Sequence, residues 1–207
     1  MRLIFRSLTI LGILTLVSLF YGCPGCEFDF PISINKMEIK LLDNSGEKPQ
    51  ITESEFQSRT AIAFTCQLFD SIYYYPYDYA YQSHAAFSIF QSAQAWSCVE
   101  NYTLENKVTD IKIKTIHDIS ANVKANDDVT HLFVAELPET HQEYLYFTID
   151  QIIERVNSNA TFWNPWVSLY LFFTIELEHD SACFDVQITL DSGEILHSVT
   201  PIIFAQN

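Results

Sequence analysis

The stretch that decides the fold class is C-F-D-V-Q-I-T-L-D-S-G, residues 183–193. Apolar and polar side chains alternate along it as far as Leu190, which is the pattern of a strand with one buried face. Asp191-Ser192-Gly193 then supplies a turn, because glycine adopts a positive φ at no steric cost. A second apolar segment runs from Glu194 to Phe204, so we expect an antiparallel hairpin. Pro201 predicts that the final strand lies at a sheet edge.

Helical signals are few and short. Thr148 and Gln151 have the spacing of a capping box, which predicts a helix over 149–157. One or two helical turns are expected after Asp127 or Asp128, either of which is a suitable cap. The other strands are expected at 34–42, 60–69, 108–116 and 166–178, while 85–98 fits a strand or a helix. This pattern predicts a mainly β fold, an antiparallel β-sandwich of immunoglobulin-like type with one or two short helices.

The amino terminus has the parts of an export signal. Arg2 and Arg6 form a basic start, and residues 8–20 are apolar without a charge. This run is shorter than the ~18 to 20 residues that a transmembrane helix needs. We therefore expect a signal peptide rather than a membrane span.

The segment L-F-Y-G-C, residues 19–23, resembles the lipobox of bacterial lipoproteins. The resemblance implies that the signal is removed and that Cys23 becomes lipid-anchored at the cell envelope. Cys26, which follows Gly25, is a second candidate, and a plain cleaved signal is the alternative. The predicted organisation is a signal peptide over 1–22, a lipidated tether over 23–31 and a single β-sandwich domain over 32–207.

A wider resemblance rests on short motifs in two regions. L-E-N-K-V-T-D-I-K-I-K-T, residues 104–115, is followed by Asp128-Val129-Thr130, and F-D-V-Q-I-T-L-D-S-G-E occupies residues 184–194. Together they are similar to uncharacterised lipoproteins of roughly this length found in Bacteroidetes. The resemblance implies an anchored β-rich domain at the outer membrane, facing the periplasm or the outside, and assigns no activity to any residue.

Charge and cysteine content limit the partners and the chemistry. The chain has 26 acidic and 11 basic residues, a formal net charge of −15, so nucleic acid is a poor partner. The acids are spread out, as on a solvated surface. In an oxidising compartment, the cysteines that remain beside Cys23 allow two disulfides, and free buried thiols are the alternative. These cysteines are Cys26, Cys66, Cys98 and Cys183.

Sequence motifs for catalysis are missing. After the signal the glycines are Gly25, Gly46 and Gly193, and this spacing excludes the usual phosphate loops, dinucleotide fingerprints and nucleophile elbows. The histidines include no pair at metal-ligand spacing, and residues 43–47 form a turn rather than a calcium loop. We expect no cofactor, no metal and no catalytic residue, hence a binding or interaction module. An envelope hydrolase using a carboxylate pair is the alternative.

One aromatic cluster suggests a ligand surface. Tyrosines crowd residues 71–82 around Pro76, in a predicted loop or irregular edge. Aromatic faces offer a platform for sugar rings or for a protein partner, whereas packing of this loop on the sandwich is the alternative explanation. The candidate ligand-binding residues are Tyr73, Tyr75, Tyr77, Tyr79 and Trp96.

Overall fold

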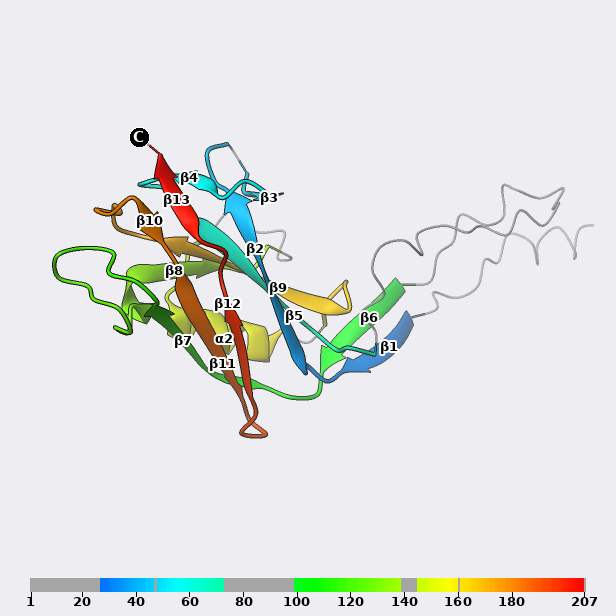
Figure 1. The fold of residues 1–207 in the computed structure, drawn as a ribbon. Coiled ribbons are helices and arrows are strands. Elements are labelled where there is room, and N and C mark those ends of the chain that lie inside the picture. Colours follow the sequence, from blue (N-terminus) through cyan, green and yellow to red (C-terminus); the bar gives the residue numbers. More distant parts are fainter. Residues whose placement is uncertain (1–26, 47, 73–98, 139–144, 160, 207) are drawn as a thin grey trace, which may run out of the picture.

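The computed structural model describes residues 27–46, 48–72, 99–138, 145–159 and 161–206. The fold is mainly β with antiparallel sheets, as predicted, in a sandwich-like arrangement (Figure 1). The immunoglobulin-like connectivity remains a prediction. The signal segment 1–22 and the ambiguous segment 85–98 lie outside the described residues.

The larger sheet has the strand order β3-β2-β5-β9-β8 and is antiparallel throughout. Its strands are β2 (Lys36–Asp43), β3 (Gln50–Thr52), β5 (Ala63–Phe69), β8 (Phe133–Glu136) and β9 (Trp166–Phe173). The predictions at 34–42 and 60–69 are confirmed. β5 and β9 are buried along most of their length on both faces, which is why β9 departs from the simple alternation expected of it.

β9 also ends at Phe173, before the predicted end at Glu178. The guanidinium of Arg59 holds the following segment in an irregular course. Its Nη1 donates to the carbonyl oxygens of Leu177, Glu178 and His179 at 3.1, 3.3 and 2.9 Å. Its Nη2 donates to Asp180 Oδ1 at 2.6 Å. These bonds occupy carbonyl groups that a longer strand would use for its ladder.

The second sheet has the order β12-β11-β7. It contains the hairpin of β11 (Phe184–Leu190) and β12 (Ile195–Val199), with β7 (Val108–Thr115) on the other side. The hairpin is confirmed, and Gly193 has the positive φ of +84° that the turn requires. The regular alternation of β11 is confirmed as well.

The predicted strand over 194–204 is two strands. β12 is the edge strand of the second sheet. The edge position that Pro201 predicted for the final strand is wrong, because β13 (Ile203–Gln206) lies in the middle of a third sheet with the order β10-β13-β4. The chain leaves β12 at Thr200, whose hydroxyl accepts a hydrogen bond from the Phe184 N–H at 3.0 Å. The small strands of this sheet are β10 (Ser181–Ala182) and β4 (Phe56–Ser58).

Two strand pairs in this mainly antiparallel fold are parallel. β13 pairs with β4, and β1 (Glu27–Ile32) pairs with β6 (Val99–Leu104). Part of the predicted tether over 23–31 is therefore a strand. The two parallel pairs join segments far apart in the chain, so no hairpin signal in the sequence marks them.

Four phenylalanine rings join the two larger sheets. Phe64, Phe133 and Phe173 extend from the five-stranded sheet, and Phe184 extends from β11. The ring centroids of Phe184 lie 5.9, 5.2 and 5.7 Å from those of the other three. These rings are part of one main core that draws on residues from Ile34 to Ile203.

The helix α2 (Ile149–Ser158) closes the side of the sandwich at β7 and β8. The predicted capping box is present, since the Gln151 N–H donates to Thr148 Oγ1 at 3.4 Å and the Thr148 N–H donates to Gln151 Oε1 at 3.1 Å. Its buried side chains are Ile149, Ile152 and Val156. No helix of the described ranges is long and apolar enough to cross a membrane.

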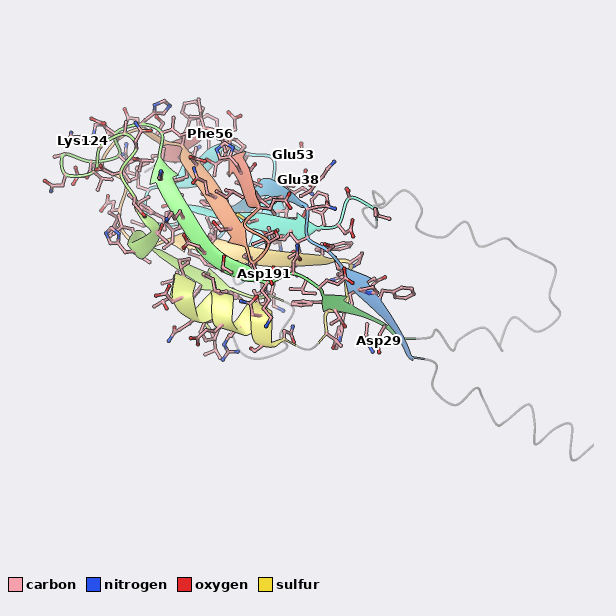
Figure 2. All side chains as sticks on the ribbon, turned by 90° about the horizontal axis from the view of Figure 1, so that it is seen from below. Asp29, Glu38, Glu53, Phe56, Lys124 and Asp191 are labelled. Carbon is pink, nitrogen blue, oxygen red and sulfur yellow. The ribbon has the colours of Figure 1, made fainter. Side chains whose placement is uncertain are left out.

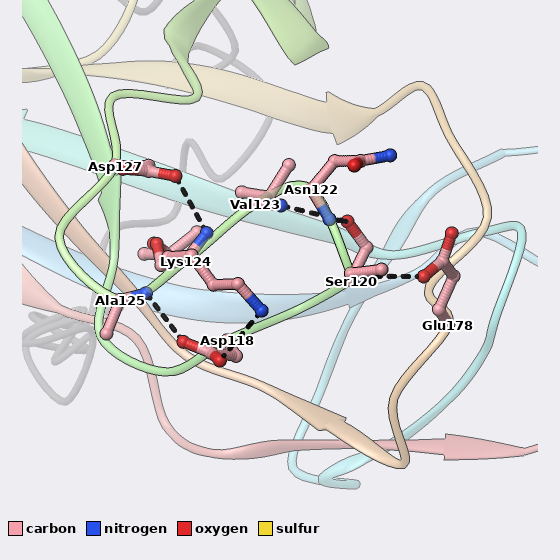
Figure 3. A network of polar contacts seen from close by, with 10 residues as sticks. Asp118, Ser120, Asn122, Val123, Lys124, Ala125, Asp127 and Glu178 are labelled. Atoms are coloured by element: carbon pink, nitrogen blue, oxygen red, sulfur yellow. Dashed lines mark hydrogen bonds and ion pairs between the residues drawn. The ribbon is translucent and has the colours of Figure 1, made fainter.

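The loop after β7 is held in shape by two of its own carboxylates and by one from the segment after β9 (Figure 3). Asp118 accepts hydrogen bonds from the Ala125 N–H at 2.9 Å and from Lys124 Nζ at 3.3 Å. Asp127 accepts one from the Lys124 N–H at 2.7 Å, and Glu178 accepts one from the Ala121 N–H at 3.0 Å. The bond from Ala125 is the main reason that the pKa of Asp118 is lowered. Part of the acidity of this chain therefore serves to fix backbone N–H groups.

The short helix predicted after Asp127 or Asp128 is a 3-10 turn, η3 (Thr130–Leu132). The predicted aspartate cap is wrong, because Val129 occupies the cap position and provides no side-chain bond. Asp128 instead accepts hydrogen bonds from the N–H and hydroxyl of Thr130, at 3.0 and 2.6 Å. This geometry is an aspartate turn one residue ahead of the cap.

Phe184→Ala is expected to lower the free energy of unfolding by about 3–5 kcal/mol, because it leaves a cavity among the four rings. Chemical denaturation of the full chain in detergent measures this. Phe204→Ala is the control, since that ring is exposed, and it should cost about 1 kcal/mol or less. Equal losses in the two variants would contradict the role assigned to the ring cluster.

Candidate functional site

A cavity of about 300 Å³ opens at the end of the molecule where β2, β3, β4 and β13 meet. We call it the polar cleft, and it is defined by Asp43, Asn44, Thr52, Phe56 and Gln206. Hydroxyl and amide groups make up most of its remaining wall. Figure 2 shows Phe56 at this end of the molecule, far from Asp29.

The turn after β2 supplies the charged side of the polar cleft. Asp43 Oδ1 accepts hydrogen bonds from the Ser45 N–H at 2.9 Å and from the Ser45 hydroxyl at 2.6 Å. These two bonds lower the pKa of Asp43, so its carboxylate is ionised at neutral pH. The turn predicted over these residues is confirmed, and it leaves Oδ2 of Asp43 available to a ligand.

Gln57 fixes β4 against the larger sheet. Its side chain is buried, and Nε2 donates to the carbonyls of Leu42 and Ala63 at 3.2 and 3.0 Å. Oε1 accepts a hydrogen bond from the Ala63 N–H at 2.8 Å. Because neighbouring side chains of a strand point to opposite faces, burying Gln57 turns Phe56 outward.

The ring of Phe56 is the aromatic surface of the polar cleft. The side chain is 56% exposed. It contacts the ring of Phe204, its partner in the parallel pair, with a centroid distance of 5.5 Å. A ring braced from one side and open on the other offers a flat face for an apolar group of a ligand.

Two side-chain amides of the polar cleft have unused hydrogen-bonding groups. Asn44 and Gln206 form no side-chain hydrogen bond within the described residues. Each amide can donate and accept, and the Asp43 carboxylate can accept. Together with the exposed ring, these groups suit a small ligand that has hydroxyl groups on its edge and C–H groups on its face.

A second depression, of about 550 Å³, contains two carboxylates and bears on the hydrolase alternative. Asp128 and Asp150 line it together with His131. The Thr130 hydroxyl lowers the pKa of Asp128, whereas a carboxyl that acts as general acid needs a raised pKa. Glu136 has a raised pKa because it is buried, but it does not line this depression. The described carboxyl with the raised pKa therefore lies away from this depression.

The described part of the chain has no cluster of side chains that could bind a metal ion. There, no three His, Cys, Asp or Glu side chains converge in a way that could hold an ion.

Cys66 and Cys183 are free, buried thiols, as in the alternative to the two disulfides. Cys66 lies in the core on β5, and burial raises its pKa. The Cys183 thiol donates to the carbonyl oxygen of Thr200 at 3.3 Å, and burial is the main reason that its pKa is raised. Both are therefore structural side chains in this fold.

The other sequence-predicted site residues lie outside the described residues. They are the lipidation candidate Cys23, the cysteines Cys26 and Cys98, and the aromatic candidates Tyr73, Tyr75, Tyr77, Tyr79 and Trp96. No family model matches this chain, and no curated protein matches it.

Sequence reasoning missed the polar cleft. Asn44 was part of a predicted turn, Phe56 stands alone among polar residues, and Gln206 lies at the far end of the chain. No motif relates the three. Parallel pairing of β4 with β13 brings Gln206 to Phe56, and the Gln57 bond to Leu42 holds β4 near the end of β2, which precedes Asn44. The one local signal was the exposed turn over 43–46.

Glu136→Gln is expected to raise the free energy of unfolding at pH 7. Glu136 is buried on β8, and its Oε2 has no hydrogen-bond partner among the described residues. Burial raises its folded pKa above the ordinary 4.5. The folded state therefore holds its proton more tightly than the unfolded state, and stability falls as the pH rises through this window.

Denaturation across pH measures the effect. The gain from Glu136→Gln should be largest near neutral pH and should shrink below the ordinary glutamate pKa, where both side chains are neutral. Glu176→Gln, at an exposed position, is the control and should give no gain. A gain from Glu136→Gln that persists unchanged at acidic pH would contradict this explanation.

Proposed function

We propose that this chain is a lipid-anchored envelope protein whose β domain is a non-catalytic module that binds saccharides in the polar cleft. The proposal rests on the polar groups that lie around the exposed ring of Phe56. The unpaired amides of Asn44 and Gln206 and the ionised Asp43 surround Phe56.

The chemistry of a sugar matches these groups. Ring hydroxyls donate and accept in fixed directions, and planar amide and carboxylate groups can meet two of them at once. The C–H face of a sugar can lie on the Phe56 ring. Since Asn44 and Gln206 have no side-chain bond to another described residue, their bonds to a ligand replace bonds to water. The volume of about 300 Å³ is at the small end of ligand sites, so it suits a short saccharide.

The position of the polar cleft supports the anchored arrangement. β1 begins at Glu27, only a few residues after Cys23. Each residue spans at most ~3.6 Å, so a lipid on Cys23 would hold the β1–β6 pair near the membrane. Figure 1 places this pair and the β4–β13 pair at opposite ends of the molecule. The polar cleft would then face away from the membrane.

The double variant Asn44→Ala/Gln206→Ala is expected to weaken saccharide binding at least tenfold. A glycan array probed with the full chain in detergent identifies the saccharide, and titration calorimetry measures its affinity. Phe56→Ala should weaken binding to a similar degree. Thermal stability should stay nearly unchanged in the double variant, because it removes no internal hydrogen bond.

Asn122→Ala is the matched control, since Asn122 lies in the loop of Figure 3, and it should bind as the wild type does. Wild-type affinity in the double variant would show that the polar cleft is not the binding site.

The triple variant Tyr75→Ala/Tyr77→Ala/Tyr79→Ala tests the tyrosine cluster in parallel. If only this variant abolished binding, the ligand would bind at the tyrosine cluster and not in the polar cleft. Failure of the wild type to bind any saccharide would overturn the proposed function.

Cys23→Ser is expected to abolish acylation of the full chain produced in a bacterial host that processes lipoproteins. The hydroxyl of serine cannot replace the thiol that carries the lipid. Mass spectrometry or metabolic labelling with a fatty acid detects the modification. Cys26→Ser is the matched control and should remain acylated. Acylation that persists in Cys23→Ser and disappears in Cys26→Ser would move the anchor to Cys26.

A further inference from the structure

The end of the molecule that contains β1 and β6 has aromatic side chains at its surface. Phe30 of β1 and Tyr102 of β6 are partners in the parallel pair, and their rings stack with a centroid distance of 5.6 Å. Both side chains are only partly buried. Tyr102 also packs against the main core, so the stacked rings connect β1 to the body of the domain.

Trp163 extends this aromatic surface. The residue before it, Phe162, forms an isolated bridge with Tyr102. The Tyr102 N–H donates to the Phe162 carbonyl at 2.8 Å, and the Phe162 N–H donates to the Tyr102 carbonyl at 2.7 Å. Phe162 is buried, whereas Trp163 is 62% exposed. The bridge therefore places an exposed tryptophan next to β6.

Ile72 lies at the same end, on the segment that follows β5. The buried Asp70 accepts hydrogen bonds from the Ser33 N–H at 3.4 Å and from the Asn35 side chain at 3.2 Å. Asp70 Oδ1 also accepts one from the Ile72 N–H at 2.9 Å. Because Ser33 directly follows β1, these bonds hold Ile72 near the β1–β6 pair. Its side chain is 73% exposed, the highest value for a large apolar side chain among the described residues.

The charged residues around this surface have both signs. Asp29, which Figure 2 shows at this end, and Glu105 are exposed, and so are Lys36 and Lys107. None of the four forms an ion pair with another described residue. A zwitterionic lipid headgroup offers a partner of each sign, whereas an anionic headgroup would repel the two acids.

We propose that the surface formed by Phe30, Ile72, Tyr102 and Trp163 lies in the headgroup region of the bilayer that holds the chain. This inference rests on the proposed anchor at Cys23. Tryptophan and tyrosine favour the boundary between membrane and water, because they combine an apolar ring with a polar group. Glu27, the first residue of β1, is four residues after Cys23, so β1 begins at most ~14 Å from the lipidated residue.

The anchor makes this contact intramolecular. A short linker gives a second contact an effective concentration on the order of millimolar. A few exposed apolar side chains are then sufficient, although they would not hold a free domain on a membrane. The lipid alone restrains the position of Cys23 but not the orientation of the domain. Contact through the β1–β6 end would fix the orientation and turn the polar cleft, at the opposite end (Figure 1), towards the solvent.

The test measures tryptophan fluorescence of the acylated chain in nanodiscs of phosphatidylcholine. Bromine atoms placed near the headgroup end of the acyl chains quench only those tryptophans that contact the bilayer. The wild type is expected to be quenched relative to nanodiscs without bromine, and Trp163→Phe should lose most of this quenching. Trp166→Phe, at a partly buried position, is the control and should retain it.

Ile72→Asp tests whether the surface acts as a unit. A carboxylate at the bilayer boundary is costly, so this variant should reduce the quenching of Trp163. Ile175→Asp is the matched control, because Ile175 is an exposed isoleucine that follows the other end of β9. It should be quenched as the wild type is. Thermal stability should stay nearly unchanged in both variants, since both side chains are exposed.

Three results would overturn the bilayer contact. One is quenching that Trp163→Phe leaves intact, and another is an equal loss in the two aspartate variants. The third is self-association of the wild type in detergent that Ile72→Asp abolishes, since a second copy of the chain would then occupy the surface. Mass spectrometry of the same sample separates this inference from the anchor. An acylated chain without quenching contradicts the contact alone, and an unacylated chain contradicts both.

Discussion

The contact of Phe184 with Phe64, Phe133 and Phe173 holds the two larger sheets together, and the rest of the fold depends on it. Each ring is buried, and burying one phenylalanine side chain contributes about 1.5–3 kcal/mol. Ring contacts at these distances add specific geometry to the burial. Because the rings come from β5, β8, β9 and β11, they fix which strands face each other across the core.

The two sides of the joined sheets are covered by different elements. The side at β7 and β8 is closed by α2, by Asn157 and by the segment that contains Thr130. At the other edge, β12 lies close to β2, and the side chains of Ile195 and Val199 are exposed.

The polar cleft depends on two local devices. Ser45 donates hydrogen bonds to the Asp43 carboxylate and so keeps it ionised. The buried Gln57 connects β4 to the ends of β2 and β5. The same tie exposes Phe56. A membrane anchor on Cys23 would act on the opposite end of the molecule, at β1. The proposed anchor and the proposed ligand site thus do not compete for the same surface.

Sequence by itself determined the features that arise from local periodicity and local hydrogen bonds. The alternation of β11, its turn at Gly193 and the capping box at Thr148 are confirmed, because each needs only residues a few positions apart. Tertiary structure decided the features that need distant partners. Arg59 ends β9, parallel pairing brings Gln206 to Phe56, and core burial leaves Cys66 a free thiol. No local pattern encodes them, since each depends on how the packed sheets place segments that are far apart in the chain.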